Sequence, residues 1–138
     1  MAINYLNKLF ENATAADPRT VSIGVAVPAN SLVIVGMTAR RVAGAPGIAS
    51  VSDTQGNTYT TYSASNSTNR VGVSYCRTAA PMTTSDTLTI DWSVTPEQMW
   101  VSGHAFDNAV LPRHSQAFSS IHSGGGNNPQ ITVDVTGS

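Results

Sequence analysis

From residue 20 onward, the chain is divided into short runs in which apolar residues occupy every second position. The run 87–93 shows this best, since Leu88, Ile90 and Trp92 alternate with polar residues. Alternation with a period of two is typical of β-strands that bury one face. Eight or nine such runs, separated by turn residues about every 8–12 positions, predict an all-β antiparallel β-sandwich. Its topology, jelly-roll or immunoglobulin-like, stays open because periodicity carries no strand order.

The stretch 50–62 predicts a β-hairpin in the middle of this pattern. Its strands would be residues 48–52 and 58–62, joined by a turn that contains Asp53, Gly56 and Asn57. Glycine accepts a positive φ, and Asp and Asn hydrogen-bond to nearby backbone amides in turns. The run 32–37 is apolar at nearly every position, which predicts a central strand.

Residues 1–18 have a different pattern from the rest of the chain. Ile3, Leu6, Leu9 and Phe10 recur at intervals of three to four, as on one face of a short amphipathic helix. We therefore expect an N-terminal arm over 1–18, helical or extended, followed by a sandwich domain over 19–138. The arm would pack on its own sandwich or dock on a neighbouring subunit.

The low charge of the chain limits the classes of partner. Charged residues make up 11% of 138 residues and the net charge is −1, so no electrostatic footprint for nucleic acid is present. Arg40 and Arg41 form the one basic pair and are candidates for contact with a partner. The first residues do not resemble a signal peptide, and no apolar run approaches the roughly 20 residues of a membrane span. We expect a protein made in the cytoplasm, with no membrane association.

Catalytic and metal-binding interpretations find little support. A catalytic triad would need Ser102, His104 or Asp107 to meet other groups such as His114 and His122, and no Gly-x-Ser-x-Gly turn is present. The sequence therefore predicts no enzyme. Cys76 is the single cysteine, which excludes an intrachain disulfide.

Two binding sites can be compared with simpler structural roles. Asp53, Gln55 and Asn57 have the spacing of calcium ligands, but position 64 is Ala where an EF-hand loop needs its closing Glu. A turn capped by Asp53 explains them better, so we expect no metal and no cofactor. An aromatic platform for sugars is the second candidate, because aromatic faces bind the apolar faces of sugar rings. Its residues would be Trp100, Tyr59 and Tyr62, with Trp92 and Tyr75 nearby, although the pattern places Trp92 in the core.

Residues 20–106 resemble a β-sandwich family of bacterial and phage proteins. The resemblance rests on an Asp-x-x-Gly-Asn-x-Tyr segment (Asp53, Gly56, Asn57, Tyr59), on Tyr75 in a later strand, and on the Thr-rich run 87–93. It implies a phage virion protein or an adhesive domain, and the short chain resembles a capsid decoration (cement) protein or a small tail component. It supplies no catalytic residues.

This resemblance leads to a working hypothesis for function. The chain would be a virion protein that binds the major capsid protein or other virion subunits as a homo-oligomer, with a trimer favoured. Its contacts would be Leu6, Leu9 and Phe10 in the arm, Arg40 and Arg41 in the loop 40–47, and the loop 124–129. The alternative is a carbohydrate-binding or adhesive module that uses the aromatic platform.

Overall fold

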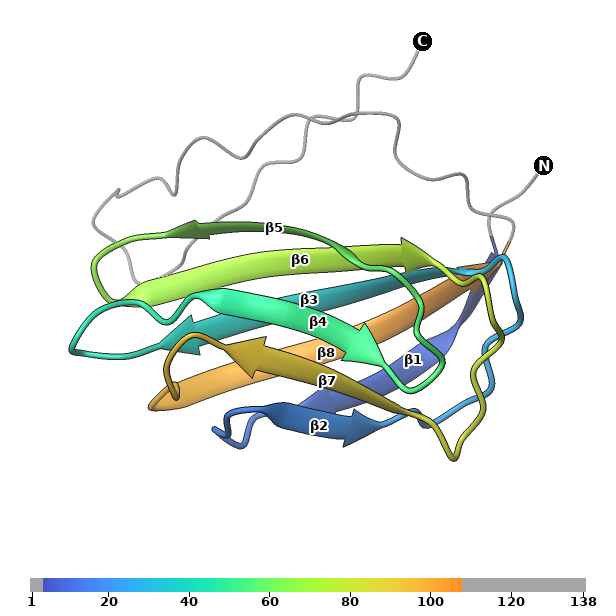
Figure 1. The fold of residues 1–138 in the computed structure, drawn as a ribbon, viewed down its shortest axis with the longest axis horizontal. Helices are drawn as coiled ribbons and strands as arrows, with labels where there is room; N and C mark the ends of the chain where they lie inside the picture. The colour runs from blue at the N-terminus through green and yellow to red at the C-terminus, as the bar shows by residue number, and fades with distance from the viewer. Residues whose placement is uncertain (1–3, 108–138) are drawn as a thin grey trace, which may run out of the picture.

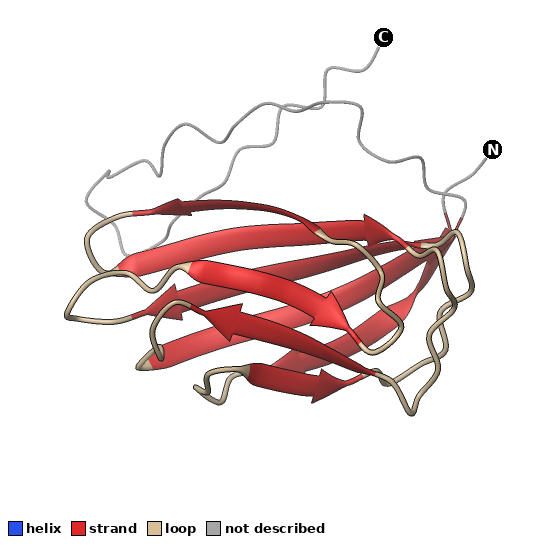
Figure 2. Cartoon of the chain, in the orientation of Figure 1, coloured by secondary structure: helices blue, strands red, loops and turns tan. Residues whose placement is uncertain are grey.

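The computed structural model describes residues 4–107, which form two antiparallel β-sheets packed face to face (Figure 1). Across the larger sheet the order is β1 (Asn4–Asn12), β8 (Gln98–Asp107), β3 (Leu32–Arg40), β6 (Asn69–Arg77) and β5 (Thr60–Ser65). Across the smaller sheet it is β2 (Arg19–Ser22), β7 (Thr87–Trp92) and β4 (Ile48–Asp53). Figure 2 draws every described segment as strand or loop, and none of residues 4–107 belongs to a helix that could cross a membrane. The prediction of an all-β antiparallel sandwich is confirmed, and residues 4–107 contain eight strands.

The core lies between the two sheets and follows the alternation seen in the sequence. Val33, Val35 and Met37 of β3 face Leu88 and Ile90 of β7, and each of these side chains is at most 1% exposed. Full burial of one such side chain stabilises the fold by about 1.5–3 kcal/mol. β3 lies between β8 and β6, so the prediction of a central strand is also confirmed.

The N-terminal segment is a strand of the sandwich, so the helical alternative for the arm is wrong and the extended one is present over Asn4–Asn12. β1 pairs with β8 at one edge of the larger sheet, with register shifts between Tyr5 and Asn7 and between Lys8 and Phe10. A bulge of this kind adds one residue to a strand, so that two adjacent side chains can turn to the same face. Leu9 and Phe10 are accordingly 2% and 8% exposed in the chain's own core.

The predicted hairpin at 48–62 is also wrong, although its turn is present. Gly56 has a φ of 74° and its amide donates to the Asp53 carbonyl at 3.2 Å. However, β4 pairs with β7 and β5 pairs with β6, so the connection between β4 and β5 crosses from one sheet to the other. Among the seven connections that join the eight described strands, the one between β5 and β6 alone stays within a sheet.

Candidate functional site

The outer face of the larger sheet, meaning the face turned away from β2, β7 and β4, carries several of the candidate functional residues. Strand register aligns its side chains in rows that cross the sheet. One row joins His104, Ile34 and Tyr75, and the next joins Ser102, Gly36, Val73 and Tyr62. A further row joins Trp100, Thr38, Val71 and Ala64.

β6 gives this outer face an apolar character. Its outward residues are Val71, Val73 and Tyr75, whereas Gly72 and Ser74, which lie between them and face the smaller sheet, are small. Gly72 is one of these inward positions, where an added Cβ would collide with the Ile48 side chain. A solvated face of an antiparallel sheet is usually polar. β6 therefore places its bulkier apolar groups on the side opposite the core.

Aromatic contacts strengthen two regions of the outer face. Tyr5 lies 5.4 Å from Phe106 and 6.0 Å from His104 between ring centroids, and its hydroxyl is 3.3 Å from His104 Nδ1. Near the opposite edge, the rings of Tyr62 and Tyr75 are stacked at 6.1 Å. Offset aromatic pairs at these separations add about 0.5–1.5 kcal/mol to simple burial.

The candidate catalytic residues do not gain the geometry that a triad requires. The hydrogen-bond partner of His104 is the Tyr5 hydroxyl, which does not orient a base as a carboxylate would. Ser102 is 5% exposed on the flat strand β8, away from any sharp turn. His114 and His122 lie outside the described residues, as does the loop 124–129.

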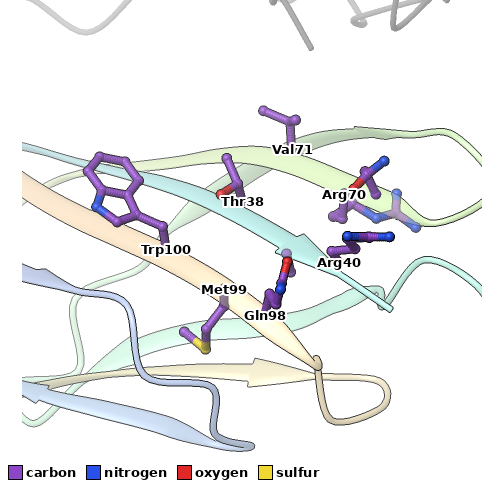
Figure 3. Close-up of a pocket in the computed structure, with 9 residues that line it drawn as sticks. Thr38, Arg40, Arg70, Val71, Gln98, Met99 and Trp100 are labelled. Carbon is purple, nitrogen blue, oxygen red and sulfur yellow. The ribbon is translucent and has the colours of Figure 1, made fainter. Parts of the chain in front are cut away.

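A hollow of about 430 Å³ opens on the outer face where β3, β6 and β8 lie side by side. Figure 3 shows that Trp100, Thr38 and Val71 project from these three strands to the same side, while Met99 points to the other side. The end of the hollow beyond them is lined by Arg40 and by further residues of the same strands: Ala39, Asn69, Arg70, Gln98 and Met99. The volume is within the range of about 300–1,000 Å³ that small-molecule sites occupy.

The structure separates the residues proposed as a sugar platform. Trp100 is 40% exposed beside the hollow, whereas Trp92 is 3% exposed in the core, as the sequence pattern predicts. The phenol of Tyr59 donates to Asp53 Oδ2 at 2.9 Å, and burial raises the pKa of Tyr59 far above its usual value. Tyr62 lies on the outer face with Trp100, but in a different row and three strands away. Of these aromatic residues, Trp100 alone lines the hollow.

The Asp53 segment serves the fold, as the turn interpretation predicts. The Asp53 carboxylate accepts hydrogen bonds from the amides of Gln55 and Asn57, at 2.9 and 3.1 Å, and from the Asn57 side chain at 3.0 Å. Asn57 Oδ1 in turn accepts from the amides of Ala79 and Ala80, at 2.8 and 3.1 Å. The loop after β4 is thereby joined to the loop after β6.

A second carboxylate, which sequence reasoning missed, extends this network. Asp86 accepts from the Thr54 hydroxyl at 2.7 Å, from the Thr83 amide at 2.7 Å and from the Gln55 side chain at 2.8 Å. The Thr54 hydrogen bond is the largest of these effects, and together they hold the pKa of Asp86 well below its usual range. The signal in the sequence is Thr83-x-x-Asp86, a short polar segment just before a strand.

Acid is expected to weaken the fold through Asp86. A carboxyl group whose pKa is lower in the folded state than in the unfolded state stabilises the fold above its unfolded-state pKa, about 3.9 for Asp. That contribution decreases as the pH falls below this value, because protonation then favours the unfolded chain. Urea unfolding between pH 6 and pH 2 should show a steeper loss for the natural chain than for Asp86→Asn. Parallel curves for the two proteins would contradict this assignment.

Within the described part of the chain, no group of three or more His, Cys, Asp or Glu residues lies close enough to hold a metal ion. Cys76 is buried, and burial raises the pKa of its thiol to about 11.

Comparisons with protein-family models, with curated proteins and with solved structures find no match for this chain.

Proposed function

We propose that this chain is a structural protein of a phage particle, and that it binds a neighbouring virion subunit through the outer face of its larger sheet. The observation that carries the proposal is the outward apolar stripe of β6, formed by Val71, Val73 and Tyr75. Aromatic residues and low charge are typical of the centre of protein interfaces. Capsid decoration, with the major capsid protein as partner and a homo-oligomer as the bound form, is the role that the sequence resemblance favours.

The dimensions of this face suit such an interface. Five strands about 4.8 Å apart, four of them nine or ten residues long and β5 six, form a surface of about 20 by 30 Å. Each partner in a stable complex buries about 800 Å². The sequence predicts partner contacts for Leu6, Leu9 and Phe10. These side chains do not form part of the proposed interface, because Leu9 and Phe10 are buried in the chain's own core and Leu6 packs against it.

A charge at the centre of the face provides the test. Val73 is half-buried between Gly36 and Tyr62, so Val73→Lys would place an unpaired ammonium group inside the proposed interface. Ser50→Lys, at an exposed position on β4, is the matched control. In purified particles of the phage that encodes the chain, we expect at least tenfold fewer copies of Val73→Lys and an unchanged number of Ser50→Lys copies.

Two results would contradict the interface. One is an equal number of copies of both variants in the particles. The other is a loss of several kcal/mol in the free energy of unfolding of the isolated Val73→Lys chain, since this would mean that the chain itself covers the outer face.

A second function, carbohydrate binding, is favoured by one specific observation. Trp100 is 40% exposed and lines a hollow that also carries polar side chains. Sugar sites combine an aromatic face with polar groups around its rim. This function needs neither Tyr59 nor Tyr62, because neither residue lines the hollow.

A further inference from the structure

The chemical groups in the hollow differ from one end to the other. In Figure 3, the indole of Trp100 lies at one end of the lining and the side chain of Arg40 lies at the other. Thr38 and Val71 lie between them, and they contribute a hydroxyl group and apolar surface. A ligand that fills this space would meet an aromatic face first and a positive charge at its far end.

The indole of Trp100 is held in place by neighbouring side chains. Its Nε1 donates to Glu11 Oε1 at 3.2 Å, and Glu11 Oε2 accepts from Lys8 Nζ at 2.8 Å. Both partners belong to β1, the edge strand beside β8. An aromatic ring that is already oriented loses little conformational entropy when a flat ligand stacks on it.

Within residues 4–107, the guanidinium group of Arg40 is unpaired. It forms no side-chain hydrogen bond or ion pair with the residues between 4 and 107. Arg70 differs, because its guanidinium donates to the Pro46 carbonyl at 3.0 Å and to Ser63 Oγ at 3.3 Å. The nearby Glu97 carboxylate accepts from the Val42 amide at 3.1 Å and is therefore engaged in the adjoining loop.

We propose that this hollow binds a sugar that carries a carboxylate group, such as a uronic acid. The sugar ring stacks on Trp100, and its carboxylate accepts two hydrogen bonds from Arg40, whose planar fork of donors matches a carboxylate. The Thr38 hydroxyl and the Gln98 amide supply partners for the sugar hydroxyl groups. The inference rests on the carbohydrate-binding function proposed above and adds the class of sugar.

A polyanion such as nucleic acid fits the hollow less well. Binding to a phosphate backbone depends on neutralising several charges in a row. The chain has a net charge of −1 and seven Lys and Arg residues in total. Of the basic residues near the hollow, Arg70 is already engaged by the Pro46 carbonyl and Ser63. The Arg40 guanidinium beside the Trp100 indole suits a ligand that carries one negative charge next to one sugar ring.

Calorimetric titration with a matched pair of sugars tests this site. The probes are trigalacturonic acid and its methyl ester, which share the same rings and differ in charge. We expect the full chain to bind the acid about tenfold or more tightly than the ester, as expected for charge-assisted hydrogen bonds. Arg40→Gln should reduce the affinity for the acid to that for the ester. Trp100→Ala should abolish binding of both.

Arg41→Gln is the control, because it removes the same charge from the adjacent position, which does not line the hollow. It should leave both affinities unchanged, and an equal loss in Arg41→Gln and Arg40→Gln would overturn the site. Equal binding of acid and ester, unaffected by Arg40→Gln, would overturn the acidic specificity and leave the sugar function standing. Failure of both probes to bind would overturn this inference, and a panel of neutral glycans would then decide the sugar function separately.

Discussion

Replacement of Asp53 by alanine is expected to lower the free energy of unfolding by about 3–4 kcal/mol. Four donors would lose their acceptor, namely the amides of Gln55 and Asn57, the Asn57 side chain and the Tyr59 hydroxyl. Each polar group left buried without a partner costs about 1–3 kcal/mol. Asn57 is 7% exposed and Tyr59 is half-buried, so water cannot fully replace the carboxylate.

Urea unfolding followed by circular dichroism measures this effect. Tyr59→Phe is the matched control, because it removes a single hydrogen bond of the same network and should cost about 1 kcal/mol. Asp91→Ala is a second control, since Asp91 is a strand carboxylate for which the structure records no side-chain hydrogen bond within residues 4–107. A loss below 1 kcal/mol for Asp53→Ala would mean that the turn persists without its carboxylate.

Gly103→Val is expected to destabilise the fold by about 2–4 kcal/mol. A Cβ at this position would overlap the ring of Phe10, the core residue that β1 contributes against β8. Overfilling a packed core typically costs about 1–3 kcal/mol, and here the clash also opposes the pairing of an edge strand. Thermal unfolding of the purified variant would measure the loss.

A second substitution makes the cause specific. Phe10→Ala alone should cost about 3–5 kcal/mol through the cavity that it leaves. In the double variant, the valine side chain occupies part of that cavity, so the combined loss should be smaller than the sum of the two single losses. A fully additive double-mutant cycle would mean that Phe10 and Gly103 do not touch, and that the register between β1 and β8 differs from the one described here.

The sequence predicts the sandwich well because alternation and burial agree in most strands. Leu88, Ile90 and Trp92 are all buried, as their spacing requires. The sequence of β1 leaves a helical and an extended arm open because bulges change its apparent period. Leu6 and Leu9 lie at the two register shifts, so the inward positions along this strand recur at about three residues instead of two.

Strand pairing could not be predicted from local patterns. The turn at Asp53 and Gly56 was recognised correctly, but β4 pairs with β7, and no local signal reports so distant a partner. Alternation also gives two faces without saying which one is the core. β6 turns Val71 and Val73 outward. Their orientation follows from the register with β3, which pairs them with the outward positions Thr38 and Gly36.

The candidate site was predicted in part. Trp100 and Arg40 were singled out separately, one for stacking and one for charge, and the structure brings both to the same hollow. The contribution of Glu11 was missed, because the two residues of its hydrogen bond with Trp100 are 89 positions apart.

The interleaving of the two sheets along the chain has a consequence for biosynthesis. The edge strand β1 finds its partner only in β8, so that Tyr5 meets His104 across 99 positions. Contacts of such high sequence separation slow folding, because a long loop must close before they form. On the ribosome, the first strand would therefore emerge early with Leu9 and Phe10 unprotected.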